Sequence, residues 1–352
     1  MKAGRPSRDS WDGAPARSQP RIGVVRYDGL IALPCLPFPT PEMTMPPRHF
    51  LDLLDWDAQR LNALFDRASQ LKADQHPQRQ PLPLAGRVLG LVFEKPSLRT
   101  RVSFQAAIAQ LGGSSIYLSG AESGMGTRET VADFARVISQ YVDALVLRTF
   151  QHRLVEEFAA VARCPVINGL SDYYHPCQAV SDFFTLRERF GALAGLTLLF
   201  LGDGNNMARS LAIGCALLGL TFLHSGPARY GFDDEFLNLF AQRFPHLPAP
   251  KIAPLAESLP RADAVYTDVW TSMGQEAEHQ VRLKAFAPFQ LNAKSAARMK
   301  PEAVVLHCLP AHRGEEITGD VLEGPRSLVF AQAGNRLHVQ KALLLELCDH
   351  GV

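Results

Sequence analysis

Short runs of branched apolar residues alternate with amphipathic stretches along most of the chain. An apolar run bounded by turn residues predicts a buried strand, and apolar positions three or four residues apart predict a helix. The first such stretch, residues 51–73, places Leu54, Leu61 and Leu64 on one stripe and predicts a helix. Further helices are predicted at 101–111, 128–140, 151–162, 176–190, 205–218 and 335–348, and strands at 88–93, 114–118, 143–148, 164–168, 196–201, 220–223, 263–266 and 303–306.

The order of these segments predicts an α/β protein, because strands that alternate with helices form parallel sheets. The alternation occurs before and after the long predicted helix 176–190, although residues 225–260 fit neither pattern. We therefore expect two doubly wound parallel-sheet domains joined by that interdomain helix, with the C-terminal helix returning to the first domain. The first domain would comprise residues 48–185 with 335–352, and the second residues 186–334. Ligands of such folds bind at the carboxyl ends of strands, so the polar motifs that follow the strands should share one cleft.

The composition is that of an ordinary globular protein, and it narrows the range of partners. Apolar residues make up 47% of the 352 residues and charged residues 20%, and a net charge of +1 does not favour nucleic acid or an anionic membrane. No apolar run reaches the ~18 residues that span a bilayer. The six cysteines are scattered without a C-x-x-C pair, which indicates neither a disulfide framework nor a metal site and fits the cytoplasm.

The first 47 residues differ from the rest of the chain. They are rich in Pro, Arg, Gly and Ser, and they lack the apolar core of a signal peptide. The acidic residues Asp9, Asp12 and Asp28 are unusual for a transit peptide. Two interpretations remain for residues 1–47: a disordered tail, or a start codon assigned too early, with translation beginning at Met43 or Met45.

A candidate anion-binding site follows the strand predicted at 88–93. There the run F-E-K-P-S-L-R-T-R leads into a helix, and a strand, a short loop and a helix N-terminus bring free backbone N–H groups to one point. Ser97 and Thr100 add hydroxyls and Arg99 adds a forked cation, which together suggest a phosphate site. The alternative is that Ser97 only caps the helix and the arginines lie on a solvated face. No G-x-x-x-x-G-K-[ST] sequence occurs, so the site is not a P-loop.

Two further motifs place polar groups at the ends of predicted strands in the first half. Arg148 ends the strand at 143–148 and can point into the cleft, although a surface position is commoner. In the sequence H-P-C-Q, His175 and Gln178 flank the start of the linking helix. His175 offers a donor for a carbonyl oxygen and Gln178 an acceptor for an amide NH₂. The alternative is a simple helix entry with Pro at its first position.

Three motifs follow the strands of the second half. The sequence G-D-G-N-N at 202–206 lacks the third glycine of a dinucleotide-binding loop, so its Asp and Asn residues fit caps and turns. The sequence D-V-W-T-S-M-G-Q-E begins at Asp268, an acid that could hold an ammonium group or cap the next helix. The sequence H-C-L-P follows the last strand. Because adjacent side chains of an extended segment point in opposite directions, His307 and Cys308 are not expected to form a catalytic dyad.

These motifs, together with Arg148-Thr149 and the sequence N-R-L-H at 335–338, occur in an order that resembles the ornithine carbamoyltransferases. The resemblance covers about residues 49–350. The S-M-G loop combined with H-C-L-P indicates ornithine rather than aspartate as the acceptor. The resemblance implies that carbamoyl phosphate and L-ornithine give L-citrulline and phosphate, without a metal or an organic cofactor. It also implies a homotrimer or a multiple of trimers, with carbamoyl phosphate bound by the first domain and ornithine by the second.

The resemblance assigns roles to single residues. Arg148 and His175 would polarise the carbonyl oxygen, and Gln178 would orient the carbamoyl NH₂ group. Asp268 would hold the amino-acid end of ornithine, while Cys308 would lie beside the reacting δ-amine. The residues implied to bind carbamoyl phosphate are Ser97, Leu98, Arg99, Thr100, Arg148, His175, Gln178, Cys308, Leu309 and Arg336; those for ornithine are Asn206, Asp268, Ser272 and Met273; those for catalysis are Arg148, His175, Asp268 and Cys308.

Two positions depart from the family pattern. Many members have Thr where Leu98 stands, so one hydroxyl is lost, although the backbone N–H remains. Many also carry a Gln that reaches a neighbouring subunit's site, and Gly124 occupies the aligned position here. That difference leaves the contact between subunits open.

Other activities remain as alternatives to a cytoplasmic enzyme of arginine biosynthesis. One is a transcarbamoylase for N-acetylornithine or putrescine, against which the S-M-G loop and Asp268 argue, because those acceptors have no free α-amine to hold. Another is a non-catalytic paralogue, against which the complete set of polar residues argues.

Overall fold

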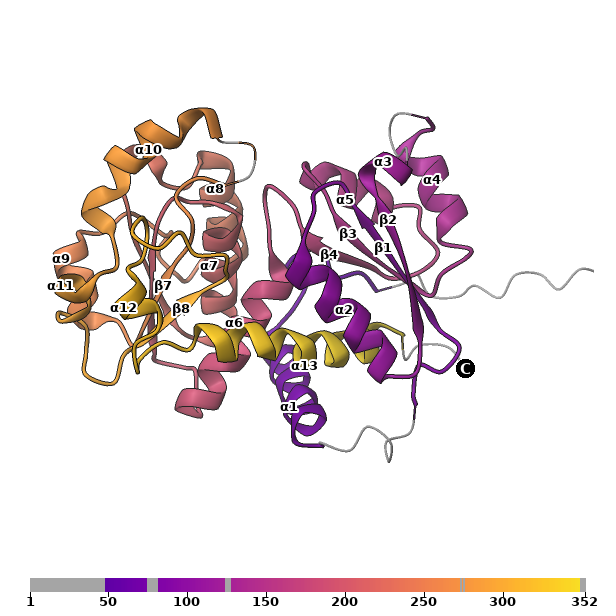
Figure 1. The fold of residues 1–352 in the computed structure, drawn as a ribbon, viewed down its shortest axis with the longest axis horizontal. Helices are drawn as coiled ribbons and strands as arrows, with labels where there is room; N and C mark the ends of the chain where they lie inside the picture. Colours follow the sequence, from indigo (N-terminus) through magenta and orange to yellow (C-terminus); the bar gives the residue numbers. More distant parts are fainter. Residues whose placement is uncertain (1–47, 75–81, 124–127, 273, 275, 349–352) are drawn as a thin grey trace, which may run out of the picture. The chain divides into compact units, whose positions relative to one another are not determined.

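The fold is taken from a computed structural model, which describes residues 48–74, 82–123, 128–272, 274 and 276–348. The predictions for residues 1–47, Gly124 and Met273 lie outside this part of the chain. Two four-stranded parallel sheets follow one another along the sequence, each with helices around it (Figure 1). The predicted α/β fold class is therefore confirmed. None of the helices in the described ranges is long and apolar enough to cross a membrane.

The first sheet has the strand order β2–β1–β3–β4, and all neighbouring strands are parallel. Strand alternation sends Leu89 and Leu91 of β1 into one core and Val92 into another, which α4 and α5 cover. The elements are α1 (Ala58–Ala73), β1 (Val88–Phe93), α2 (Leu98–Gln110), β2 (Ser114–Ser119), α3 (Gly120–Ser123), α4 (Val131–Ile138), β3 (Ala144–Arg148), α5 (His152–Ala159) and β4 (Val166–Leu170).

The second sheet repeats this plan with the parallel order β6–β5–β7–β8. Leu198 and Phe200 of β5 share a core with α7, while Leu199 and Leu201 face the opposite side. The helices and strands from α6 onward are α6 (Pro176–Phe190), β5 (Thr197–Leu201), α7 (Asn206–Leu218), β6 (Thr221–Ser225), α8 (Asp234–Arg243), α9 (Leu255–Ser258), β7 (Ala264–Thr267), α10 (His279–Phe286), α11 (Ala293–Ala296), β8 (Val304–His307), α12 (Gly319–Leu322) and α13 (Val329–Cys348).

Helices α6 and α13 join the two halves. One continuous apolar core runs from Leu91 of the first sheet through Phe184 of α6 to Phe200 of the second sheet. Helix α13 starts beside β8 and packs against α6, α1 and α2, so the C-terminal helix returns to the first half as predicted (Figure 1). Close packing of α6 on α7 requires the glycine at position 214, because a Cβ on Gly214 would lie 2.1 Å from Cε2 of Phe183.

Side-chain caps move two predicted helix starts. Helix α1 begins at Ala58 rather than at residue 51, because the Asp57 carboxylate accepts a backbone hydrogen bond and caps the helix there. Helix α2 begins at Leu98, because the hydroxyl of Ser97 accepts from Thr100 N. Leu98 and Thr100 therefore lie in the first helical turn and not in a preceding loop.

Other elements also differ from the prediction. Strand β4 is displaced by two residues from the predicted 164–168, and the unassigned stretch 225–260 contains α8 and α9. Helix α13 begins at Val329, six residues before the prediction. Its first turns carry fully buried polar side chains, including Gln332 and Asn335, which hide the apolar period.

Candidate active site

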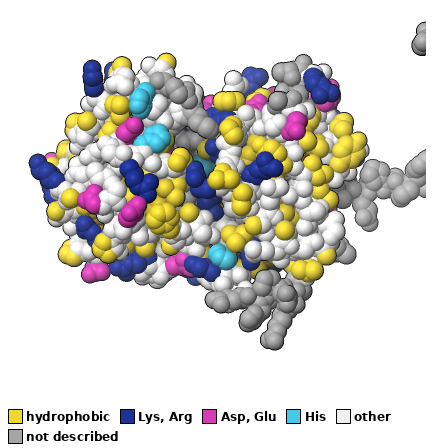
Figure 2. All heavy atoms as spheres, in the orientation of Figure 1, with side chains coloured by type: hydrophobic (Ala, Val, Ile, Leu, Met, Phe, Trp, Pro, Cys, Tyr) yellow, Lys and Arg dark blue, Asp and Glu magenta, His cyan; other side chains and the backbone are white. Residues whose placement is uncertain are grey.

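A cavity of about 1000 Å³ lies at the carboxyl ends of both sheets. The surface is notched between the two lobes in Figure 2, and Lys and Arg side chains gather there. Strand ends and helix starts from both halves contribute to its wall, as expected for a parallel α/β fold. The predicted site residues that line it are Ser97, Leu98, Arg99, Thr100, Arg148, His175, Asn206, Asp268, Ser272, Cys308, Leu309 and Arg336.

The start of α2 forms one wall of the cavity. Strand β1 ends at Phe93, and a short turn leads to Ser97, whose hydroxyl accepts from Thr100 N at 3.3 Å. The first N–H groups of a helix have no partner within that helix, and the helix dipole adds positive potential. Ser97 thus caps the helix, and the capped turn itself faces the cavity, so the two interpretations of this motif are compatible.

Buried cationic groups surround this helix start. Arg336 on α13 is 3% exposed, and its Nη2 donates to Thr100 Oγ1 at 2.7 Å. Nε of Arg336, Nε of Arg148 and Nδ1 of His175 are buried without a hydrogen-bond partner among the described residues. A buried polar group without a partner costs about 1–3 kcal/mol, so a ligand with several acceptor oxygens would be stabilised here.

The charges in this end of the cavity also favour an anion. Burial, together with Arg336 and Arg99, lowers the pKa of Arg148 to about 10. Burial likewise lowers the pKa of Arg336. The pKa of His175 lies well below its ordinary value because the ring is buried beside Arg336 and Arg148, so His175 is neutral at pH 7. The site is therefore a cluster of arginines with a neutral imidazole, which suits a phosphate ligand.

The start of α6 places His175 and Gln178 beside the arginines. His175 occupies the N-cap position without a side-chain cap, Pro176 follows at N1, and the His175 backbone N–H donates to Ser210 Oγ at 2.8 Å. Gln178, one turn later, is 1% exposed and is not among the residues that line the cavity. Its Nε2 donates to Asp182 Oδ1 at 2.8 Å, and its Oε1 has no partner within the described ranges.

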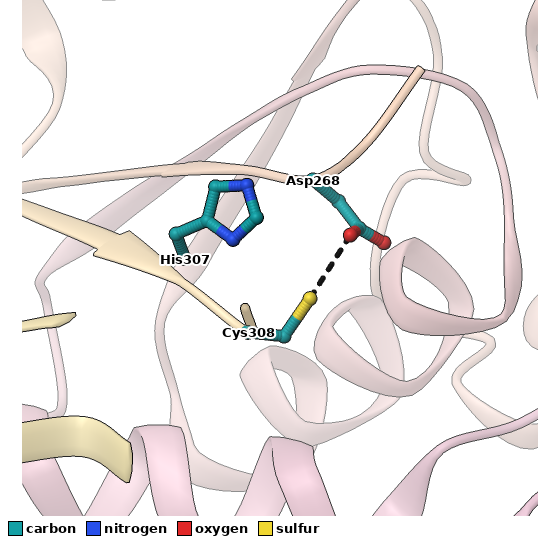
Figure 3. Close-up of side chains that lie close together, drawn as sticks. All are labelled: Asp268, His307 and Cys308. Carbon is teal, nitrogen blue, oxygen red and sulfur yellow. Dashed lines mark hydrogen bonds between the residues drawn. The ribbon is translucent and has the colours of Figure 1, made fainter. Parts of the chain in front are cut away.

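An acid and a thiol stand at the carboxyl ends of β7 and β8 (Figure 3). The Cys308 thiol donates to Asp268 Oδ1 at 2.9 Å, and Asn205 Nδ2 donates to Asp268 Oδ2 at 3.0 Å. Burial and the adjacent Asp268 raise the pKa of Cys308 well above its ordinary value, so Cys308 is an uncharged thiol at pH 7. Asp268 follows a strand and precedes a loop, so it is not the helix cap that its position allowed.

His307 and Cys308 lie closer together than strand alternation predicts. Side-chain atoms of His307, Cys308 and Asp268 fall within 4.8 Å of one another, because β8 ends at His307 and the chain turns there. The hydrogen bonds nevertheless direct the two side chains to different partners. His307 Nε2 lies 3.0 Å from Glu316 Oε1, and His307 Nδ1 accepts from Leu309 N at 2.8 Å.

Two groups of side chains in the described ranges have donors of the kinds that bind metal ions. Asp268, His307 and Cys308 form one, but both ring nitrogens of His307 are already engaged. His312, Glu315 and Glu316 form the other, and Glu316 is the residue that holds His307.

The remaining predicted residues lie on the second half. Asn206 Nδ2 donates to Ser171 O at 2.6 Å, and Ser272 lines the cavity. Leu309 has a φ of 57°, in the left-handed region that only a few per cent of non-glycine residues adopt. Such outliers concentrate at ligand sites, where the surrounding structure holds them in place.

Sequence reasoning missed several cavity residues. Lys95 is 9% exposed, lies 4.4 Å over the Phe150 ring, and has its pKa lowered by burial and by Arg148. Lys95 belongs to the F-E-K-P-S-L-R-T-R run, and this position could have indicated a role at the candidate anion site. Arg282 on α10 does not line the cavity itself, but it donates to the lining residue Asp203 and to the carbonyl of Trp270. No local pattern in the sequence announces that contact.

Comparison with known proteins decides the family. Residues 48–188 match the model of the carbamoyl-P binding domain of aspartate/ornithine carbamoyltransferases, and residues 194–347 match that of the Asp/Orn binding domain. The chain belongs to the aspartate/ornithine carbamoyltransferase family. The resemblance seen in the motifs is thus confirmed.

Members of this family named ornithine carbamoyltransferase are similar over their whole length. The protein of Bacillus subtilis is 48% identical over 308 residues, which cover 86% of this chain and 95% of that relative. The Gloeobacter violaceus protein is 49% identical over 301 residues, covering 84% and 94%. Among solved structures, the Pyrococcus furiosus enzyme superposes with a TM-score of 0.83 at 41% identity, over 88% of this chain and 100% of that one.

Proposed function

We propose that this carbamoyltransferase transfers the carbamoyl group of carbamoyl phosphate to the δ-amine of L-ornithine, giving L-citrulline and phosphate. The observation that carries the proposal is the division of one cavity. Buried arginines, a neutral histidine and a helix N-terminus occupy one end, and a carboxylate and a thiol occupy the other. The names of the relatives support ornithine as the acceptor.

The phosphate of the donor would bind at the start of α2. Ser97, Arg99 and Thr100 would donate to its oxygens, and Leu98, whose side chain is 76% exposed, would contribute only its backbone N–H. Arg336 already contacts Thr100 and would complete the charge neutralisation of the leaving phosphate. An Arg at these positions matters for its forked geometry, which Lys does not reproduce.

The carbamoyl group would lie between α6 and the loop after β8. Its carbonyl oxygen would accept from Arg148 and His175, whose Nε and Nδ1 atoms are buried without a partner among the described residues. One such donor typically contributes ~3–4 kcal/mol when the oxygen becomes an oxyanion. The carbamoyl NH₂ would donate to Gln178 Oε1 and to the backbone carbonyls of Cys308 and Leu309, and the left-handed Leu309 sets the direction of that backbone.

Ornithine would bind at the second half. Asn206, Asp268, Ser272 and Met273 would hold its α-amino and carboxylate ends, and Cys308 would position the δ-amine. A primary amine with a pKa near ~10.4 needs roughly 4–5 kcal/mol to lose its proton at pH 7. The arginine cluster and burial lower that cost, because both disfavour an ammonium group. The neutral amine would then attack the carbamoyl carbon, and phosphate would leave.

An acceptor panel tests the proposed function. Purified protein is given carbamoyl phosphate with L-ornithine, N-acetylornithine, putrescine or L-aspartate, and each carbamoylated product and phosphate are measured. Citrulline should form with a kcat/KM at least a hundredfold above those of the other acceptors. Equal turnover of any other acceptor contradicts the assignment, and no turnover with any of them indicates a non-catalytic member.

We further propose that residues 48–185 with 335–352 form the carbamoyl phosphate domain, that residues 186–334 form the ornithine domain, and that their closure completes the site. We place the enzyme in the cytoplasm and in arginine biosynthesis. Four cysteines within the described ranges, Cys164, Cys177, Cys215 and Cys308, are free thiols, which supports a reducing compartment.

A homotrimer, or a multiple of trimers, is the proposed assembly. Leu98 and Val102 of α2 and Ile116 of the edge strand β2 are 76%, 53% and 47% exposed. Exposed apolar side chains on neighbouring elements are typical of subunit contacts. Light scattering coupled to gel filtration should give about three times, or a multiple of three times, the 38.7 kDa chain mass.

A further inference from the structure

We propose that Asp182 is a positioning residue that holds the Gln178 amide with its oxygen turned away from Asp182 and toward the carbamoyl NH₂ group. The inference rests on the proposed function, because it concerns how that NH₂ group is recognised. It adds to the site a residue that does not line the cavity.

The contacts converge on one carboxylate oxygen. Asp182 lies on α6 one turn after Gln178 and is fully buried. Its Oδ1 accepts from Gln178 Nε2 at 2.8 Å and from Gln332 Nε2 of α13 at 2.7 Å. The Gln178 side chain is therefore held at its nitrogen, while Oε1 is left buried and unpaired among the described residues. A buried acceptor without a partner is available to a donor that arrives with a ligand.

The ionised form of Asp182 suits this task because an ionised carboxylate only accepts hydrogen bonds. A glutamine amide can turn over to exchange its oxygen and nitrogen, and the partners decide which orientation is stable. The other orientation of Gln178 would place its oxygen against Asp182 Oδ1, two acceptors in contact. It would also present an N–H to the carbamoyl NH₂, two donors in contact. Asp182 thus excludes the orientation that would reject the substrate.

A rival role for Asp182 is electrostatic. The pKa of Asp182 is raised to about 7, and burial is the main cause. Hydrogen bonds from Gln178 and Gln332 and the charge of Arg336 act in the opposite direction and oppose that rise. Asp182 could therefore act as the buried counter-charge of Arg336, and so of the phosphate site. The two roles make different demands: positioning needs an oxygen at the place of Oδ1, whereas compensation needs the negative charge.

Three substitutions separate these roles. Asp182→Ala removes both the oxygen and the charge, Asp182→Asn keeps an oxygen but removes the charge, and Asp182→Glu keeps the charge but displaces the oxygen. Ser181→Ala is the matched control, because Ser181 is the neighbouring fully buried polar residue and its hydroxyl donates to Cys177 O of the same helix. Each variant is checked by circular dichroism and thermal unfolding.

The readouts are the KM of carbamoyl phosphate, the KM of ornithine and the inhibition constant of inorganic phosphate, which has no NH₂ group. We expect Asp182→Ala to raise the carbamoyl phosphate KM about tenfold, the effect of one hydrogen bond. Phosphate inhibition and the ornithine KM should stay within twofold. Asp182→Asn should stay within about threefold of wild type, and Asp182→Glu, which carries the test if Asp182→Ala does not fold, should resemble Asp182→Ala.

Three results would overturn the inference. An Asp182→Asn variant as impaired as Asp182→Ala, or a loss of phosphate affinity in Asp182→Ala that parallels the rise in the carbamoyl phosphate KM, would show that the charge is what matters. An unchanged carbamoyl phosphate KM in folded Asp182→Ala would show that Asp182 does not position Gln178. Because wild-type citrulline formation is measured in the same series, failure of the proposed function would be seen separately.

Discussion

Replacing Asp268 by Asn probes the acceptor end of the cavity, because the substitution keeps the shape of the side chain and removes its charge. One Asp268 oxygen accepts from the Cys308 thiol and from a backbone N–H, and the other accepts from Asn205 Nδ2. In the variant, a nitrogen must face one of these donors. Asn205 cannot turn its amide to compensate, because its oxygen caps α7 by accepting from two backbone N–H groups.

Two separable losses follow from this geometry. A hydrogen bond to a charged group contributes ~1.5–3 kcal/mol, so losing the carboxylate that we propose faces the ornithine ammonium should raise the ornithine KM about 10- to 100-fold. The Asn205 donor that is left without a partner costs about 1–3 kcal/mol in the free energy of unfolding, which lowers Tm by a few degrees. The carbamoyl phosphate KM should change less than twofold, because we propose that its phosphate binds at the other end of the cavity, at the start of α2.

The assay is the initial rate of citrulline formation with each substrate varied in turn, alongside thermal unfolding. Asp263→Asn is the matched control. Asp263 stands at the opposite end of β7 from the cavity, where it accepts from Lys300 Nζ at 2.7 Å and Thr197 N at 2.9 Å. An Asp268→Asn enzyme whose ornithine KM is unchanged, or a control with an equal rise, would refute the placement of Asp268.

Two further predictions concern stability. Burial lowers the pKa of His224 to about 4, so between pH 6.5 and 4 the unfolded chain binds a proton that the folded chain does not; stability should fall as pH decreases through this range. Between pH 7.5 and 4.5, the free energy of unfolding measured with urea should therefore fall by about 2–3 kcal/mol more in wild type than in His224→Asn. An equal fall in both proteins would exclude His224 as the cause. Gly214→Ala places a methyl group 2.1 Å from Phe183 and should cost ~1–3 kcal/mol, whereas Gly334→Ala, where a Cβ meets nothing within 4 Å, should not lower Tm.

Positions at strand ends were the part of the site that the sequence could predict. Parallel strands bring their carboxyl ends to one edge, so polar residues that directly follow apolar runs converge even when they lie far apart in the chain. Arg148 at the end of β3, Asp268 after β7 and Cys308 after β8 satisfy that rule, and each lines the cavity. For these residues, the apolar pattern alone was sufficient to indicate a shared location.

Contacts made in the middle of helices could not be predicted in this way. Asp182 is buried within α6, where a sequence pattern predicts packing and gives no hint of a polar partner. Gln332 is the residue that reaches it, 150 positions later, and it lies in a part of α13 that the apolar period did not reveal as helical. Buried side chains that satisfy one another across such distances depend on tertiary packing, which periodicity does not encode.

Helix α13 shows why these unpredicted contacts matter for a site shared by two halves. Gln332 accepts from His307 N at the end of β8 and donates to Asp182, while Arg336, one turn further along, donates to Thr100 in the first half. Residues four apart lie on the same face of a helix. One helix face therefore makes three contacts. They are with His307, which directly precedes Cys308, with Asp182, which bonds to Gln178, and with Thr100 at the start of α2. A shift of α13 would disturb all three contacts together, so the arrangement of the proposed donor and acceptor sites depends on the packing of α13 as well as on that of α6.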